Sequence, residues 1–191
     1  MGQIIGLIGK KRSGKDTFAH GLPGYTRVAF ADPLRQAALA LDPIVGRPAL
    51  PGELAPMRDV RLSEVVDAIG WERAKDCVPE VRRILQRLGT ESIRAIDPDF
   101  WIRAAKAQID AIDGDVVVTD VRYPNEADAI QTMGGILVRI ERPGLPSDGD
   151  PHPSESALDD YPVDVVVQNI GSIEALQRTA EEVALIADVT V

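Results

Sequence analysis

Residues 4–17 read IIGLIGKKRSGKDT, an apolar run that leads directly into a loop rich in glycine and lysine. The apolar run predicts a buried strand, and the loop follows the pattern G-x-x-x-x-G-K, with a helix expected after it. Gly9 and Gly14 let the backbone curl so that successive N–H groups point inward, and Lys15 can reach a bound phosphate chain. The stretch therefore predicts a strand, a phosphate-binding loop and a helix.

The loop carries more positive charge than a surface turn needs. Lys10, Lys11 and Arg12 stand side by side and would repel one another unless a polyanion lay among them. Asp16 occupies the position where this pattern usually has the Ser or Thr that holds Mg²⁺, so the metal could be held by Thr17, by Asp16 through water, or by an acid later in the chain. We expect the whole loop to contact the phosphates of a nucleotide: Gly9, Lys10, Lys11, Arg12, Ser13, Gly14, Lys15, Asp16 and Thr17.

Composition narrows the class of protein. The chain has 191 residues, which predicts one domain over residues 1–191, and a formal net charge of −9, which argues against a general binder of nucleic acid or anionic membranes. Cys77 is the single cysteine, so no intramolecular disulfide can form. No apolar run reaches the roughly 18–20 residues of a membrane span, and the first residues lack a signal-peptide layout. We expect a soluble cytoplasmic protein.

Short strands alternate with helical patterns along the chain. Strands are expected at residues 3–8, 26–30, 116–119, 136–140 and 163–167, all rich in Val and Ile. Apolar residues recur at helical spacing over 34–41, 62–69 and 81–88, with Asp32 as cap of the first helix and Gly89 as the end of the third, and a last helix follows Ser172 as cap. This alternation predicts an α/β fold: a five-stranded parallel sheet with helices on both faces.

Two stretches rich in proline and glycine interrupt the pattern. Residues 42–59 predict an irregular connection, and residues 143–153 form a long loop between two expected strands. A long loop without secondary structure inside a compact domain is usually functional or disordered.

Charged residues follow several expected strands. Asp120 ends a buried strand, where a protein with this phosphate loop needs an acid to order Mg²⁺; a turn or cap residue is the alternative. Arg122 lies two residues further on and is either a phosphate contact or a surface charge. Arg35 in a first helical turn indicates an anionic ligand, because the helix dipole favours acids there. Arg83 and Arg87 share a helical face that could equally be solvated.

Several runs together resemble one known family, the bacteriophage-type deoxynucleoside monophosphate kinases, over nearly the whole chain. These runs are residues 9–17, LQRLGTE at 85–91, IDPDFW at 96–101, DVRYPNE at 120–126 and HPSE at 152–155. The end of the chain, residues 164–176, also resembles dephospho-coenzyme A kinases. The resemblance implies the three-layer P-loop kinase fold with a lid loop, and an enzyme that uses ATP and Mg²⁺ to phosphorylate a deoxynucleoside monophosphate (dNMP) to the diphosphate.

The resemblance also implies roles for single residues. Arg35, Gln86, Trp101, Arg122 and Asn125 are the expected acceptor-binding residues, and a lid of about residues 143–160 contains His152 and Glu155. Lys15, Arg122 and Arg142 are expected to act on the transferring phosphate, with Arg142, beyond a strand end, moving onto the phosphates. Asp120, Asp16 and Thr17 are the metal candidates.

Alternatives remain at this stage. A small-molecule kinase like dephospho-coenzyme A kinase is the nearest one, and a P-loop NTPase switch or a nucleotide-binding module without catalysis are others. The N-K-x-D run of GTPases is absent from the sequence. The expected partners are ATP and a dNMP. The oligomeric state stays open, with a homodimer as one option, and the location would be the host cytoplasm if a phage encodes the chain.

Overall fold

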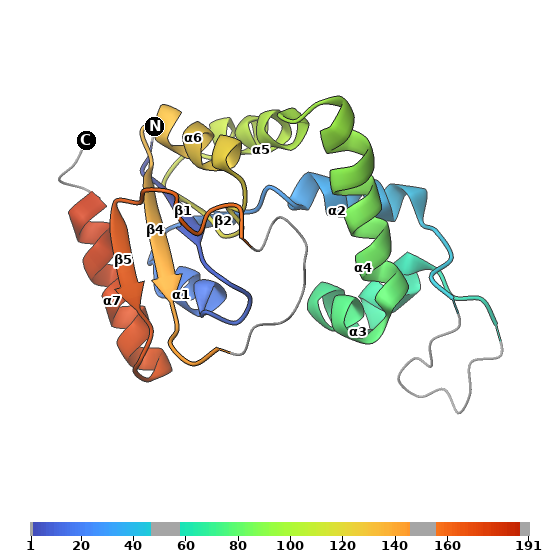
Figure 1. Cartoon of the computed structure of the whole chain (residues 1–191), viewed down its shortest axis with the longest axis horizontal. Helices are drawn as coiled ribbons and strands as arrows, with labels where there is room; N and C mark the ends of the chain where they lie inside the picture. The colour runs from blue at the N-terminus through green and yellow to red at the C-terminus, as the bar shows by residue number, and fades with distance from the viewer. Residues whose placement is uncertain (1, 47–57, 146–155, 188–191) are drawn as a thin grey trace. The chain divides into compact units, whose positions relative to one another are not determined.

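The computed structural model describes residues 2–46, 58–145 and 156–187 (Figure 1). Its elements are β1 (Ile4–Ile8), α1 (Lys15–His20), β2 (Thr26–Val28), α2 (Asp32–Leu41), α3 (Leu62–Cys77), α4 (Pro79–Gln86), the π-helix η1 (Arg87–Arg94), α5 (Phe100–Asp110), β3 (Val116–Val118), α6 (Pro124–Thr132), β4 (Ile136–Glu141), β5 (Val165–Gln168) and α7 (Ile173–Ala187). They form two compact units: unit 1 comprises Met1–Phe30 and Ile102–Val191, and unit 2 comprises Ala31–Trp101.

The five strands of unit 1 form one parallel sheet in the order β2-β3-β1-β4-β5. β1 lies at its centre, where Ile5 is in register with Val117 on one side and with Ile136 on the other. Every residue of β1 and β3 is buried, as expected of strands covered on both faces. The predicted five-stranded parallel sheet is therefore confirmed.

Helices cover both faces of this sheet. On one face Ala105 and Ile109 of α5 and Ala127 and Ile130 of α6 pack against alternate strand residues such as Ile4. The other face carries α1 and α7, which lie side by side in Figure 1 and contribute the apolar side chains Phe18, Leu176, Ala180 and Val183 to a second core. The three-layer α/β architecture follows from this alternation, because successive strand residues point to opposite faces.

Unit 2 is helical and has its own core. The buried side chains of α2, α3 and α4 that form it include Ala38, Leu62, Val65, Ala74 and Val81. All of these positions except Ala74 belong to the helical spacing seen in the sequence. α3 is interrupted by a non-helical residue, Gly70, with φ of 73°.

Two predicted helix boundaries are wrong. The helix over 81–88 does not end at Gly89 but continues as η1 through Arg94. Gly89 is a packing residue, because a Cβ there would lie 2.6 Å from Leu34 Cδ2. Asp32 is not a cap either: α2 begins at Asp32, the cap position is Ala31, and no side-chain cap bond forms. The cap at Ser172 is confirmed, since its hydroxyl accepts the Ala175 N–H at 3.2 Å.

Parts of two predicted loops lie outside the described residues. These parts are 47–57 of the 42–59 connection and 146–155 of the lid segment, including His152 and Glu155. Within the described residues no helix is both long and apolar enough to cross a membrane.

Candidate nucleotide-binding site

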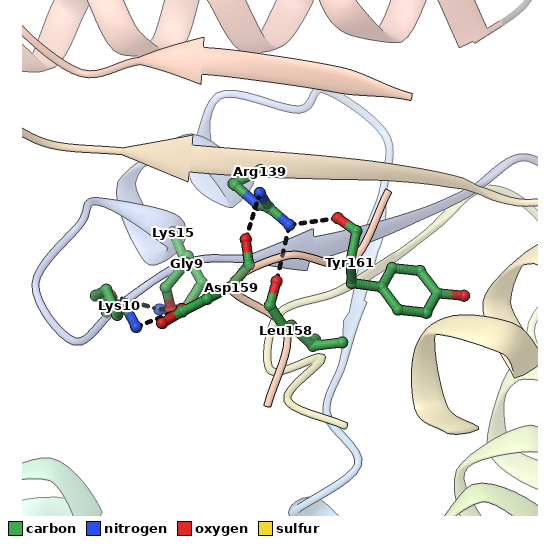
Figure 2. A network of polar contacts seen from close by, with 7 residues as sticks. All are labelled: Gly9, Lys10, Lys15, Arg139, Leu158, Asp159 and Tyr161. Carbon is green, nitrogen blue, oxygen red and sulfur yellow. Dashed lines mark hydrogen bonds and ion pairs between the residues drawn. The ribbon is translucent and has the colours of Figure 1, made fainter. Parts of the chain in front are cut away.

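The loop between β1 and α1 closes around its own lysine. The Lys15 ammonium donates hydrogen bonds to the carbonyl oxygens of Gly9 at 2.6 Å and Lys10 at 2.9 Å (Figure 2). The Ser13 N–H donates to the Lys10 carbonyl at 3.1 Å, and Arg12 has φ of 64°, an uncommon value for a residue with a side chain. These features give the loop the curled shape expected of a phosphate cradle.

Two glycines of the loop cannot be replaced without strain. Gly9 has φ of 156°, and a Cβ there would lie 2.6 Å from the Ile140 carbonyl oxygen and from the Ser13 hydroxyl. Gly14 has φ of 106°, and a Cβ there would lie 2.6 Å from Asn169 Nδ2. Both φ angles lie in a region that L side chains rarely adopt. The glycines therefore permit both the backbone path and the close contacts around it.

The Ser13 hydroxyl is buried without a protein partner in the described part of the chain. Ser13 is 1% exposed, and its Oγ has no hydrogen-bond partner among the described residues. A buried hydroxyl without a partner is costly, and such groups in native proteins call for an explanation. A phosphate oxygen would supply the missing partner. This observation supports the fit between the loop and a phosphorylated ligand.

The candidate metal residues lie beside the loop. Asp120 follows β3, which pairs with β1, and its Oδ1 accepts the Phe30 N–H at 2.7 Å, so the carboxylate is held in place. Thr17 lies in the first turn of α1, and Asp16 is exposed there. No group of three His, Cys, Asp or Glu side chains that could hold a metal occurs in the described part of the chain. Mg²⁺ bound with a nucleotide needs only one or two carboxylates plus phosphate oxygens and water, which this set can supply.

Arg122 and Asn125 lie where β3 leads into α6. The Glu126 carboxylate is 2% exposed, and its Oε2 accepts the backbone N–H groups of Arg122 at 2.8 Å and Tyr123 at 3.1 Å. This bonding fixes the backbone of Arg122 while its side chain stays exposed. Asn125 is partly buried in the first turn of α6.

The two arginines of β4 and its end have different surroundings. Arg139 donates hydrogen bonds to three backbone carbonyls, those of Asp159 at 3.0 Å, Leu158 at 2.8 Å and Tyr161 at 2.6 Å (Figure 2). Its guanidinium therefore holds the segment 158–161 against the sheet. Arg142 is exposed and lines the cavity beside the phosphate loop.

The segment held by Arg139 also contacts the loop and α6. The Asp159 carboxylate forms an ion pair with the Lys10 ammonium (Figure 2). The Tyr161 phenol donates to Asp128 at 2.5 Å. This hydrogen bond, together with partial burial, raises the pKa of Tyr161 to about 12. Residues 158–161 thus connect α6 to the phosphate loop.

A cavity of about 480 Å³ opens beside the loop in unit 1. Gly9, Lys10 and Ser13 contribute one side of it, and Arg122 and Arg142 are among the charged residues that line it. The cavity lies at the carboxyl ends of β1 and β4, the edge at which parallel α/β sheets bind ligands. Its lining holds four basic residues and two acids, Glu141 and Asp159, so its positive charge in excess suits an anionic ligand.

Arg35 in unit 2 is surrounded by groups that favour its charge. Its guanidinium lies 5.7 Å from the ring centroid of Trp71, donates to Glu72 at 3.1 Å and stands 3.7 Å from an Asp32 oxygen. Such partners hold the side chain in one orientation.

The other predicted acceptor residues of unit 2 lie near η1. Gln86 is the last residue of α4 and is partly buried, and a π-helix next to it is a feature found often at functional sites. Trp101 is 4% exposed and donates its indole N–H to the Gly89 carbonyl at 3.1 Å. Trp101 is thus buried and bonded to a residue of its own unit, and its predicted contact with a ligand stays a prediction.

Sequence reasoning missed three residues that organise the site. Glu126 fixes the backbone of Arg122, Arg139 holds the segment 158–161, and the Asn169 side chain donates to the Ser13 carbonyl at 2.8 Å. Glu126 carried a signal, since Tyr-Pro-Asn-Glu has an acid at the third helical position, where it can bond the helix start. Arg139 and Asn169 carried none, because their partners are distant in the sequence.

A family model and named relatives in sequence point to one family. A family model described as deoxynucleotide monophosphate kinase matches residues 59–180. A protein of Acanthamoeba polyphaga mimivirus, provisionally named a deoxynucleotide monophosphate kinase, is 34% identical over 192 residues, which cover 90% of each chain. The deoxynucleotide monophosphate kinase of Enterobacteria phage T4 is 35% identical over 101 residues, 50% of this chain and 42% of the phage protein. Among solved structures, a dephospho-CoA kinase from Campylobacter jejuni covers 100% of this chain and 98% of its own, with 16% identity and a TM-score of 0.48.

Proposed function

Because this chain belongs to the deoxynucleotide monophosphate kinase family, we propose that it transfers the γ-phosphoryl group of ATP to a dNMP and releases ADP and the diphosphate. The observation that supports this most strongly is the loop of residues 9–15. It combines a buried Ser13 hydroxyl without a partner among the described residues, two glycines at positive φ, and an ammonium bonded only 2.6 Å from a loop carbonyl.

The loop would bind the ATP phosphates. The Lys15 ammonium exchanges its carbonyl partners for phosphate oxygens, and the Ser13 hydroxyl gains an acceptor. Lys10, Lys11 and Arg12 supply further positive charge around the phosphates. Phosphoryl transfer needs positioning and charge stabilisation rather than a covalent nucleophile, and these cations provide both.

Asp120 is the residue that we expect to hold Mg²⁺, with Thr17 or the exposed Asp16 as the second contact. The ion, when bound, supplies positive charge beside the phosphate oxygens. The Phe30 N–H orients the Asp120 carboxylate before any ligand arrives. Ordering the carboxylate in advance lowers the entropy lost on binding.

Arg122 and Arg142 line the cavity beside the loop and are proposed to stabilise charge on the transferring group. Arg35, Gln86, Trp101 and Asn125 stay as predicted contacts of the acceptor nucleotide, on the family resemblance. The lid over 143–160 and the single domain over 1–191 stay predictions as well. We infer that the protein works on ATP and a dNMP in the cytoplasm, which is that of a host cell if a phage encodes it.

The test is ADP release from ATP measured with each of the four dNMPs, each NMP and dephospho-coenzyme A, in the presence of Mg²⁺. The proposal expects ADP release that depends on at least one dNMP and that produces the diphosphate in equal amount. ADP release without an acceptor would indicate an NTPase. Release that depends only on dephospho-coenzyme A would assign the rival kinase activity and overturn the proposal.

A further inference from the structure

Asn169 connects the last strand of the sheet to the phosphate loop. Its backbone N–H donates to the Glu141 carbonyl at 2.7 Å, which continues the pairing of β4 and β5 one residue past the end of β5. The backbone of Asn169 is therefore held by the edge of the sheet. Its side chain extends from this fixed point to a residue 156 positions away in the sequence.

That residue is Ser13. The amide Nδ2 of Asn169 donates to the Ser13 carbonyl oxygen at 2.8 Å. The same nitrogen lies only 2.6 Å from the point where Gly14 would carry a Cβ. The amide therefore lies directly against the Ser13–Gly14 peptide.

The geometry of the peptide bond gives this contact a consequence for ligand binding. In a trans peptide the C=O and the following N–H point in opposite directions. When the Ser13 carbonyl is held toward Asn169, the Gly14 N–H must point in the opposite direction within the peptide plane, away from Asn169. Inward-pointing backbone N–H groups of this kind are what a phosphate cradle uses to bind an anion.

Without such a restraint this peptide could rotate. Gly14 has φ of 106° and no side chain, so both orientations of the preceding peptide are sterically open to it. We propose that Asn169 is a positioning residue that sets the orientation of the Ser13–Gly14 peptide and so directs the Gly14 N–H toward bound phosphate. This inference rests on the proposed function in that it takes the loop as a phosphate site.

The test uses Asn169→Asp and Asn169→Ala, with binding of inorganic tripolyphosphate measured by calorimetry and kinase kinetics measured in parallel. Asn169→Asp keeps the shape of the side chain but replaces the donor by an acceptor that faces the Ser13 carbonyl. We expect tripolyphosphate and ATP to bind about tenfold more weakly to either variant, as expected for loss of one directing hydrogen bond. In the kinetics, KM for ATP rises by the same factor and KM for the dNMP is unchanged.

Ser172→Ala is the matched control. Ser172 lies three residues further on and caps α7 through the Ala175 N–H. This control lowers the melting temperature through the helix cap without touching the loop, so it separates stability from binding. We expect it to bind tripolyphosphate as tightly as the original protein.

Each other outcome overturns the inference in a distinct way. Equal affinity of the original protein and both Asn169 variants for tripolyphosphate would show that the loop does not need this restraint. If Ser172→Ala loses as much affinity as the Asn169 variants and melts at the same temperature as they do, the loss would reflect lowered stability alone. If the original protein binds neither tripolyphosphate nor ATP, the phosphate site itself is absent, and the proposed function fails together with the inference.

Discussion

The Lys15 ammonium lies 2.6 Å from the carbonyl oxygen of Gly9, six residues earlier in the same loop. We expect this charged donor to exchange its backbone carbonyl acceptors for phosphate oxygens when a nucleotide binds. When the Lys15 ammonium exchanges carbonyl oxygens for phosphate oxygens, the number of its hydrogen bonds changes little. The gain on binding comes from the full negative charge of phosphate, because hydrogen bonds between charged groups are roughly twice as strong as neutral ones.

Lys15→Ala should lower turnover by at least a hundredfold, about 2.7 kcal/mol of activation free energy. The fold should remain, because Lys15 contacts the loop and not the apolar core. Steady-state kinetics and a melting curve check both statements. Lys106→Ala is the control, since Lys106 is an exposed lysine of α5 paired with Asp110 at 2.6 Å. Retention of more than a tenth of the turnover by Lys15→Ala would remove this residue from the mechanism.

Asp120→Asn should raise the concentration of Mg²⁺ needed for half-maximal activity at least tenfold, because the charged ligand is lost while its bond to the Phe30 N–H can persist. Thr17→Ala should have the smaller effect. Titration of activity with Mg²⁺ at fixed ATP measures both, with the exposed Asp110→Asn as control. The reverse order of the two effects would show that the hydroxyl of Thr17 is the main link to the metal.

Arg142→Ala and Arg139→Ala should separate catalysis from stability. Arg142 is exposed beside the cavity, so its loss should lower turnover about tenfold and leave the melting temperature unchanged. Arg139 satisfies three carbonyls, so its loss should cost about 2 kcal/mol of unfolding free energy and lower the melting temperature by roughly 5 °C. Melting curves and kinetics on both variants test the contrast. Equal melting temperatures for the two would contradict it.

Tyr161→Phe should remove a contribution to folding stability that the original protein loses at alkaline pH. The hydrogen bond from Tyr161 to Asp128 and partial burial raise the pKa of the phenol from 10 to about 12. The folded state binds this proton more tightly than the unfolded state, so the contribution is complete below pH 10 and is lost as the pH rises from 10 to about 12. The difference in melting temperature between the original protein and Tyr161→Phe should therefore shrink between pH 9 and pH 11.5. A constant difference would contradict the role of this bond.

Local sequence determined the elements and the character of the loop. The apolar run before Gly9 predicted a strand, and the helical spacing of residues such as Leu62 and Val65 predicted a helix, both at their observed places. A strand buried on both faces is apolar throughout, and a helix buried on one face is apolar every three to four residues, so both leave a pattern in the local sequence. The spacing of the glycines and the lysine within residues 9–15 likewise predicted a phosphate-binding loop. Helix boundaries were less well predicted: Gly89 suggested a helix end, whereas its lack of a Cβ serves close contact with Leu34.

Only the tertiary structure decided which distant groups support the loop. The Asn169 amide donates to the Ser13 carbonyl, Arg139 donates to the Tyr161 carbonyl, and the Phe30 N–H orients Asp120. In two of these pairs the partner atom is a backbone carbonyl oxygen, and in the third it is a backbone N–H. Every residue except proline carries both groups, so the sequence gives no sign of which residue supplies the partner. The pairs form because the parallel sheet brings the ends of strands far apart in the chain to a single edge, and strand order is a property of the folded chain alone.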